Sequence, residues 1–362
     1  IMSIRKAVKL AASPFGGRLG PGGRSSNSGI TATVFGGYGF IGRYFINELG
    51  SCGSRVYVPF RGCELEVRHL KPMFDLGQLG LLPFSSRDEQ SIIDSLKNSD
   101  VVINMIGKHY ETKHLVPTRR SDGTLSRVNY GFDEVHVTIP ETLARLSKEA
   151  GVKCFMHVSA MSADSQSSSL WSQSKAKGEE AVRKHFPEAI IVRPATVFGP
   201  EDRFLNWIAE LNSRLPFFPL LDGGAGLVQP VYAVDVAKAL MQILNAYKEF
   251  EGKTFQLAGP AEYSYKEVIE FVSDVTGVKK PLIDVPPALA VTTGRILEQT
   301  IAPFWTTDMV AQLREDNVLR VDEELLTFKD LDMQPSSIDK EAFDFLHRFR
   351  PGGHFTLVKG YH

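Results

Sequence analysis

The stretch Thr31-Ala32-Thr33-Val34-Phe35-Gly36-Gly37-Tyr38-Gly39-Phe40-Ile41-Gly42 decides the fold. A β-rich run ends at Phe35, a glycine-rich turn follows, and an amphipathic stretch continues toward Leu49. Two glycine patterns fit: G-x-G-x-x-G at Gly37, Gly39 and Gly42, or G-x-x-G-x-x-G beginning at Gly36. In both, positions without side chains allow a tight turn and the close approach of a pyrophosphate, which lies on the helix N-terminus. This strand-turn-helix context predicts a dinucleotide-binding site.

Strand-like and helical patterns alternate through the first 200 residues. Apolar, β-rich runs are expected at residues 30–35, 55–60, 101–106, 154–159 and 189–193, with helical patterns between most of them. Near-continuously apolar strands separated by helices indicate a parallel sheet that is covered on both faces and joined by right-handed crossovers. The fold class is therefore α/β, with a doubly wound Rossmann-type parallel sheet and a smaller, mostly helical C-terminal domain.

Pattern and composition divide the chain into three parts. Residues 1–29 form a basic segment, residues 30–200 the NADP(H)-binding Rossmann domain, and residues 201–362 a mixed segment that returns to the sheet plus the C-terminal domain. An apolar helix expected at residues 288–301 is too short to span a bilayer. It packs within the small domain or, as the alternative, docks against a partner or membrane. Residues 114–130 have the composition of a long loop.

Charge and cysteine content exclude several classes of function. A net charge of −1 provides no basic field that would attract nucleic acid. The three cysteines are widely spaced and form no C-x-x-C pair, so neither a metal site nor redox chemistry is expected. No acidic residue precedes Glu48, whereas five lysines and arginines lie within the first 24 residues. This composition is typical of a mitochondrial presequence, with a basic extension as the alternative.

Arg61 directly follows the second expected strand, where NAD-binding proteins commonly carry an acidic residue for the ribose hydroxyls. A guanidinium at this place suits a 2′-phosphate through its charge and its forked donor geometry. NADP(H) is therefore favoured over NAD(H). Glu64 and Glu66 lie a little further on and leave the ribose role open. Ile106 and Gly107, at the end of the strand that begins at Val101, are expected near the ribose and nicotinamide.

The proton-donor position of this fold is altered. Working short-chain dehydrogenases use a tyrosine four residues before a lysine, together with a serine at the end of the preceding strand. Here the strand supplies Ser159 and the lysine is Lys175, but Trp171 stands in place of the tyrosine. An indole N–H donates a hydrogen bond and does not ionise at accessible pH, so no catalytic residue is assigned. Lys175 can still bind ribose hydroxyls, or it is a solvated helix residue.

The chain resembles the atypical extended short-chain dehydrogenases that serve as accessory subunits of mitochondrial respiratory complex I, NADH:ubiquinone oxidoreductase. The resemblance rests on the stretches at residues 33–44, 101–107, 146–152, 187–194, 198–206 and 229–232. By position it implies cofactor contacts from Gly36, Gly39, Phe40, Ile41, Arg61, Ile106, Ser159, Lys175 and the segment from Pro194 to Val197. The chain departs from the family pattern at Trp171, and at Ser85 and Ser86 where an aspartate is usual.

The resemblance implies a non-catalytic subunit that binds NADPH structurally and supports the stability or assembly of the matrix arm near the quinone region. Its partners would be other complex I subunits, with possible membrane-surface contact through the C-terminal domain. Its location would be peripheral, on the matrix side of the mitochondrial inner membrane. Two alternatives remain: an active NADP-dependent reductase or epimerase, and a regulator that senses NADP(H).

Overall fold

The computed structural model describes residues 15, 26–112, 125–300, 303–320 and 324–351, together with the strand at residues 116–119. Apart from Phe15 and residues 26–29, the basic segment at residues 1–29 lies outside the described residues.

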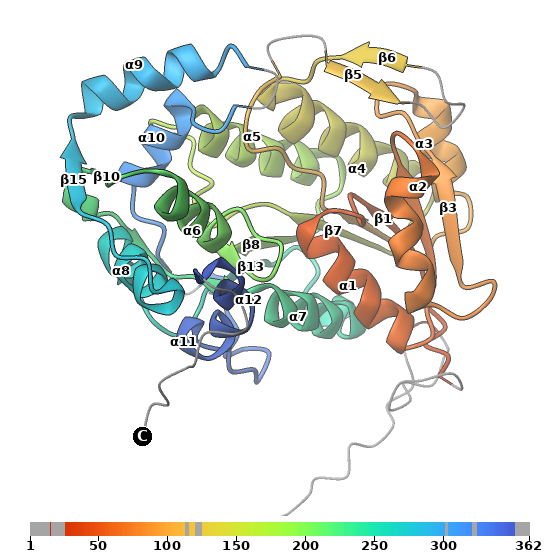
Figure 1. Cartoon of the computed structure of the whole chain (residues 1–362). Coiled ribbons are helices and arrows are strands. Elements are labelled where there is room, and N and C mark those ends of the chain that lie inside the picture. The colour runs from red at the N-terminus through yellow and green to blue at the C-terminus, as the bar shows by residue number, and fades with distance from the viewer. Residues whose placement is uncertain are drawn as a thin grey trace, which may run out of the picture.

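An eight-stranded parallel sheet forms the centre of the molecule (Figure 1), in the order β16-β13-β8-β7-β4-β1-β2-β3. The strands are β1 (Thr31–Phe35), β2 (Arg55–Phe60), β3 (Leu79–Pro83), β4 (Val101–Asn104), β7 (Cys154–Val158), β8 (Ile190–Pro194), β13 (Thr254–Leu257) and β16 (Leu325–Leu326). Strand order reverses between β1 and β4, and such a reversal opens a crevice at the carboxyl ends of the two strands.

Helices cover both faces of the sheet. On one face α1 (Phe40–Ser51) packs against α7 (Ala233–Asn245), and their buried side chains join those of the strands in one apolar cluster. On the other face lie α3 (Glu89–Leu96), α4 (Ile139–Glu149) and α5 (Leu170–His185), whose apolar side chains form a separate cluster. The doubly wound α/β fold is thus confirmed.

A second body of structure follows β8. Its apolar cluster joins α6 (Leu205–Arg214), α8 (Tyr265–Thr276), α11 (Ile338–Glu341) and α12 (Phe343–Leu346) with the parallel pair β10 (Phe218–Leu221) and β15 (Leu282–Val285). Figure 1 shows α9 (Pro287–Leu297) and α10 (Thr307–Arg314) beside this body. Two short pairs complete this part: β9 (Val197–Phe198) is parallel to β12 (Val231–Tyr232), and β11 (Leu227–Val228) is antiparallel to β14 (Tyr263–Ser264).

Two expectations need correction. The stretch at residues 114–130 is not a plain loop, because β5 (Val116–Arg119) and β6 (Leu125–Val128) pair as an antiparallel hairpin. The strand expected at residues 101–106 ends at Asn104, whose side chain accepts the amide of Ile106. The apolar pattern shows neither the pairing of two short strands nor a side-chain hydrogen bond that ends a strand. Among the described residues, no helix combines the length and the apolar character needed to cross a bilayer.

Gly178 lies at a close contact between two helical elements on the second face. Helix α5 passes the π-helical turn Glu134–Thr138 so closely that a β-carbon on Gly178 would lie 1.9 Å from the carbonyl oxygen of His136. A π-turn of this kind is rare and often marks a functional site. The contact positions α5, which carries Trp171 and Lys175, over the ends of β4 and β7.

We predict that Gly178→Ala lowers the free energy of unfolding by roughly 2 kcal/mol, because overpacking costs more than the helix propensity that alanine gains. Urea unfolding of the purified chain measures the change. Lys177→Ala, at an exposed position of the same helix, is the control and should leave stability within about 0.5 kcal/mol. A Gly178→Ala protein as stable as the control would contradict the close contact.

Candidate nucleotide-binding site

The glycine turn between β1 and α1 is fixed by backbone contacts. Gly36 has a φ of +77°, and a β-carbon there would lie 2.8 Å from the carbonyl carbon and oxygen of Met105. A β-carbon on Gly42 would lie 2.6 Å from the carbonyl oxygens of Gly36 and Gly37. At Gly37 the nearest obstacle is instead the flexible side chain of Ile46. The backbone therefore favours the pattern Gly36, Gly39, Gly42 over the alternative frame.

The N-terminus of α1 is open at the crevice. Helix α1 begins at Phe40 with Gly39 as its N-cap, no side chain caps it, and its first turn contains no acidic residue. The first amides of a helix have no partner within the helix, and together with the helix dipole they attract an anion. A pyrophosphate can therefore bind to the backbone of Phe40, Ile41 and Gly42.

The segment after β8 closes this side of the crevice. A β-carbon on Gly199 would lie 3.2 Å from the Phe40 ring. Pro194 accepts a hydrogen bond from the Met161 amide at 2.9 Å, and Val197 pairs with Val231 across β9 and β12. Pro194 and Val197, assigned from sequence to the cofactor site, thus lie on the segment that reaches the start of α1.

Lys175, Gly107 and Trp171 meet on the opposite side. A β-carbon on Gly107 would lie 3.4 Å from Lys175 Nζ, which itself lies 5.6 Å from the centre of the Trp171 ring. Ser159 is buried, and its hydroxyl has no hydrogen-bond partner within the described part of the chain. A buried polar atom without a partner is costly, so Ser159 fits a site that a ligand completes. Lys175 is equally buried and not a solvated helix residue.

The Trp171 side chain forms a hydrogen bond with a backbone carbonyl group. Its indole Nε1–H donates to the carbonyl oxygen of Lys108 at 2.7 Å, and its ring stacks on His109 with centroids 6.1 Å apart. The indole hydrogen is therefore directed to the loop after β4. Since the indole does not ionise and its one donor is used, this position supplies no proton to a substrate.

Two histidines beside this group are neutral. The Lys108 amide donates to His136 Nε2 at 3.1 Å, so His136 Nδ1–H donates to Ser174 Oγ at 2.8 Å. Burial lowers the pKa of His136 well below its usual range. Burial also lowers the pKa of His157 to about 3, with Lys175 adding to the effect. Near pH 7 neither imidazole is protonated to the imidazolium that could act as an acid, so neither donates a proton in the way that a catalytic tyrosine would.

A cluster of arginines and a tyrosine lies at the other end of the crevice. The guanidinium carbons of Arg61 and Arg87 each lie 4.7 Å from the centre of the Tyr130 ring. The Tyr130 hydroxyl is 3.0 Å from Ser86 Oγ, and Arg87 forms an ion pair with Glu134 at 2.5 Å. Sequence reasoning missed Arg87 and Tyr130, because Tyr130 reaches this place only through the turn before α4.

The crevice carries positive charge along its length. Burial lowers the pKa of Lys108 below its usual value, and the charge of Arg61 adds to this effect while the carboxylate of Glu111 opposes it. Lys175 adds a third charge near Gly107. Like charges brought together in a partly desolvated space favour a bound anion. The site is therefore suited to a phosphorylated ligand.

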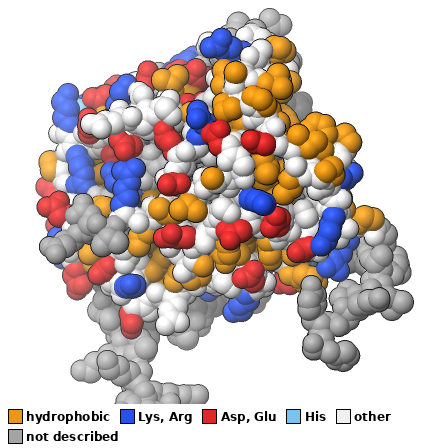
Figure 2. Space-filling model, turned by 90° about the vertical axis from the view of Figure 1, so that its left-hand side faces the viewer, with side chains coloured by type: hydrophobic (Ala, Val, Ile, Leu, Met, Phe, Trp, Pro, Cys, Tyr) orange, Lys and Arg blue, Asp and Glu red, His pale blue; other side chains and the backbone are white. Residues whose placement is uncertain are grey.

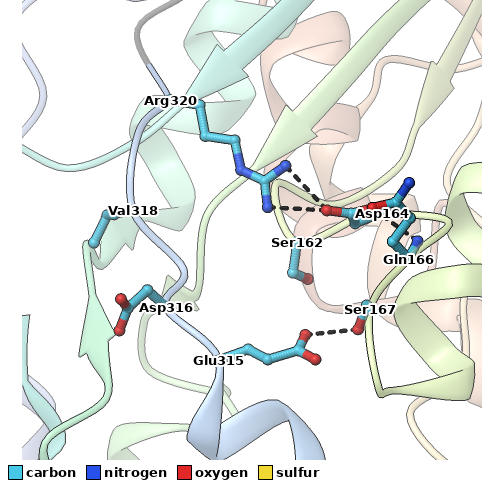
Figure 3. Close-up of a pocket in the computed structure, with 8 residues that line it drawn as sticks. All are labelled: Ser162, Asp164, Gln166, Ser167, Glu315, Asp316, Val318 and Arg320. Atoms are coloured by element: carbon cyan, nitrogen blue, oxygen red, sulfur yellow. Dashed lines mark hydrogen bonds and ion pairs between the residues drawn. The ribbon is translucent and has the colours of Figure 1, made fainter.

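A separate polar cavity of about 470 Å³ lies between the chain after α10 and the loop before α5 (Figure 3). Its walls are polar side chains and one valine: Ser162, Asp164, Gln166, Ser167, Glu315, Asp316, Val318 and Arg320. Figure 3 shows Arg320 reaching toward Asp164, and Glu315 toward Ser167. Among the described residues, no group of three or more histidine, cysteine or acidic side chains is placed to hold a metal ion.

The comparisons with known proteins agree with this geometry. The model of the NAD dependent epimerase/dehydratase family matches residues 32–258. The dTDP-glucose 4,6-dehydratase DesIV of Streptomyces venezuelae, solved with NAD and TYD bound, superposes with a TM-score of 0.63 at 17% identity, over 88% of this chain and 96% of that one. The crevice and fold thus define a nucleotide-binding protein of the epimerase/dehydratase class.

Closer relatives define the family within this class. NADH dehydrogenase [ubiquinone] 1 alpha subcomplex subunit 9, mitochondrial, of Mus musculus is 41% identical over 91% of this chain and 83% of the mouse protein. The Arabidopsis thaliana protein of the same name is 39% identical over 93% of this chain and 82% of the Arabidopsis protein. The chain belongs to this family of mitochondrial NADH dehydrogenase alpha subcomplex subunits.

The burial of the Lys175 ammonium can be tested in the nucleotide-free chain. Burial lowers its pKa to about 8 from 10.5. Below pH 8 the ammonium is present in both folded and unfolded chains, and its burial costs on the order of 3 kcal/mol. Between pH 8 and 10.5 the folded chain releases the proton while the unfolded chain keeps it, so the cost declines as pH rises.

We therefore predict that Lys175→Met raises the unfolding free energy of the nucleotide-free chain at pH 7 by roughly 2 to 3 kcal/mol, and that the gain shrinks at pH 9.5. Urea unfolding at both pH values measures this, with the exposed Lys177→Met as control. If Lys175→Met is no more stable than the unaltered chain at pH 7, burial of the ammonium does not cost stability.

Proposed function

We propose that this chain is a non-catalytic accessory subunit of mitochondrial respiratory complex I that holds NADP(H) as a structural ligand. One observation carries the non-catalytic part: Trp171 occupies the proton-donor position and its indole N–H is hydrogen-bonded to the Lys108 carbonyl. The relatives' names, which place those proteins in mitochondrial NADH dehydrogenase, support the assignment to complex I. The partners are then other subunits of that complex.

The cofactor contacts in this proposal come from both sides of the crevice. The glycine turn and the start of α1 bind the pyrophosphate, Arg61 binds the 2′-phosphate, and Lys175 binds ribose. The full set is Gly36, Gly37, Gly39, Phe40, Ile41, Gly42, Arg61, Ile106, Gly107, Ser159, Lys175, Pro194 and Val197. Within the described residues, the Ser159 hydroxyl has no hydrogen-bond partner and no side chain caps α1. Both observations support this set, because a bound dinucleotide would supply the missing partners.

We place the protein peripherally on the matrix side of the inner membrane, with the C-terminal region toward the membrane surface. Figure 2 shows hydrophobic side chains gathered on one side of the face that it presents. Large exposed apolar side chains of the α9 region and the β10–β15 pair are Phe217, Ile283, Leu289, Ile296, Leu297 and Phe304. Exposed apolar groups of this kind support contact with a partner or a lipid surface.

A structural nucleotide has a thermodynamic rationale. A ligand that binds only the folded chain stabilises it by about 4 kcal/mol at a thousandfold excess over its dissociation constant. The β1–α1 turn, the loop after β4, and α5 come from distant parts of the sequence and meet at the crevice. A ligand that contacts all three would join them without any chemistry.

Isolating the native complex tests the proposal directly. We expect denaturation of the purified complex to release NADP(H) in amounts stoichiometric with this chain, and we expect no NADPH oxidation by the chain with carbonyl substrates. Chromatography of the released nucleotide and absorbance at the NADPH band measure the two quantities. Turnover above the uncatalysed rate would instead identify an active reductase, and ready exchange of the nucleotide would favour a sensor.

Arg61→Ala tests the choice between NADP(H) and NAD(H). Removing charge-assisted hydrogen bonds to the 2′-phosphate should weaken NADPH binding by roughly 10- to 100-fold, with a much smaller effect on NADH. Calorimetric titration with both nucleotides measures the ratio. The control is Arg145→Ala, which removes from α4 a guanidinium paired with Glu89 of α3 and Glu149 of α4. Equal losses for both nucleotides would place Arg61 outside the 2′-phosphate site.

A further inference from the structure

Helix α10 lies against the loop that leads into α5, although residues 307–314 and 164–171 are far apart in sequence. Two carboxylates of this region, Asp308 in its first turn and Glu315 at its C-cap, are seven residues apart. That spacing is close to two helical turns, which places both side chains on one face of the helix. Both accept hydrogen bonds from the loop before α5.

Asp308 binds the start of α5. Its Oδ1 accepts the amide of Leu170 at 2.7 Å, and its Oδ2 accepts the hydroxyl of Ser169, the N-cap of α5, at 2.9 Å. Asp308 also lies in the first turn of its own helix, whose N-cap is Thr306. One carboxylate therefore lies at two helix N-termini, where both dipoles stabilise a negative charge.

Glu315 binds the two residues of the same loop that directly precede Ser169. Its Oε2 accepts the Ser167 hydroxyl at 2.6 Å, and its Oε1 accepts both the amide and the hydroxyl of Ser168 at 2.7 Å. These hydrogen bonds lower the pKa of Glu315 below its usual value, even though burial opposes them, so the group is ionised near pH 7. In Figure 3 this contact lies at one end of the polar cavity, and the Arg320–Asp164 pair lies at another.

The loop held in this way leads directly to the nucleotide site. Trp171 is the second residue of α5 and Lys175 lies one turn further along the same helix. Ser174 Oγ donates to the Trp171 carbonyl at 2.7 Å and receives the hydrogen of His136 Nδ1. A shift at the first turn of α5 would therefore move the groups that face Gly107.

We propose that Asp308 and Glu315 are positioning residues for the nucleotide site: they hold the start of α5 so that Trp171 and Lys175 face the crevice. By the same contacts, nucleotide binding at α5 stabilises α10. This inference rests on the proposed function, because it specifies how the same nucleotide site is regulated by the C-terminal region.

The coupling extends to α9. Glu298, one residue beyond that helix, accepts the Thr307 amide and hydroxyl at 2.6 and 2.5 Å, and a β-carbon on Gly294 would lie 2.9 Å from the Thr307 amide nitrogen. Helix α9 therefore packs tightly on the first turn of α10, beside Asp308. Its exposed side chains Leu289 and Ile296 thus belong to a unit whose order depends on the nucleotide site.

The test uses the full chain, NADPH as the probe, and hydrogen exchange of backbone amides read by mass spectrometry. In the unaltered chain we expect NADPH to slow exchange both at residues 36–46 and at residues 305–316, although α10 lies outside the crevice. In the double variant Asp308→Asn, Glu315→Gln we expect about tenfold weaker NADPH binding. At saturating NADPH, protection at residues 36–46 should persist while protection at residues 305–316 is lost.

Asp222→Asn is the matched control. Asp222 pairs with Arg314 of α10 at 2.6 Å on a contact that does not involve α5. Its φ is +48°, a conformation that asparagine also tolerates. This variant removes one carboxylate from the surroundings of α10, and should keep both the NADPH affinity and the two regions of protection.

The outcomes separate this inference from the proposed function. NADPH protection at residues 36–46 without protection at residues 305–316 in the unaltered chain would refute the coupling and leave the nucleotide site standing. The coupling would also be refuted if the double variant kept the full NADPH affinity and the full protection at residues 305–316. Absence of NADPH binding to the unaltered chain would overturn the proposed function, and the positioning role with it.

Discussion

The approach of the β1–α1 turn to the end of β4 is the constraint on which the nucleotide site depends. Gly36 adopts a left-handed conformation and lies so close to the Met105 backbone that no side chain fits between them. This contact occurs at the point where strand order reverses, which directs the amides of α1 into the crevice. Gly42 then lets α1 start directly against the turn. The remaining groups of the site are placed relative to this corner.

Helix α5 forms the other side of the site and connects three regions. Gly178 brings it against the π-helical turn before α4, Lys175 faces Gly107, and its first turn is held by Asp308. In a working dehydrogenase this helix delivers the proton donor. Here Trp171 donates its one hydrogen to the Lys108 carbonyl, so the same position fastens the loop after β4 to the helix. The Trp171 side chain thus makes a packing and hydrogen-bonding contact, as expected for the proposed non-catalytic role.

The relation between sequence and structure differs from element to element. The strand at residues 55–60 lies where the apolar pattern predicts it, because a buried strand of a parallel sheet is apolar along most of its length. The strand expected at residues 101–106 ends at Asn104, whose side chain accepts the Ile106 amide and turns the chain. The β5–β6 hairpin was missed. The contacts of Arg61 and Arg87 with the Tyr130 ring were also missed, because the three residues belong to different segments that only folding brings together.

By itself the sequence determined the glycine turn, the alternation of strands and helices, the arginine after the second strand, and the tryptophan before Lys175. Each is a local pattern, since turn chemistry, burial of a strand and the acidity of a side chain depend on a few neighbouring residues. Tertiary structure alone decided that the Ser159 hydroxyl has no hydrogen-bond partner among the described residues and that Lys175 is buried with a lowered pKa. It also decided that Asp308 and Glu315 accept hydrogen bonds from Leu170 and Ser168. These properties arise from groups more than a hundred residues apart, or from desolvation, and neither is encoded in a local pattern.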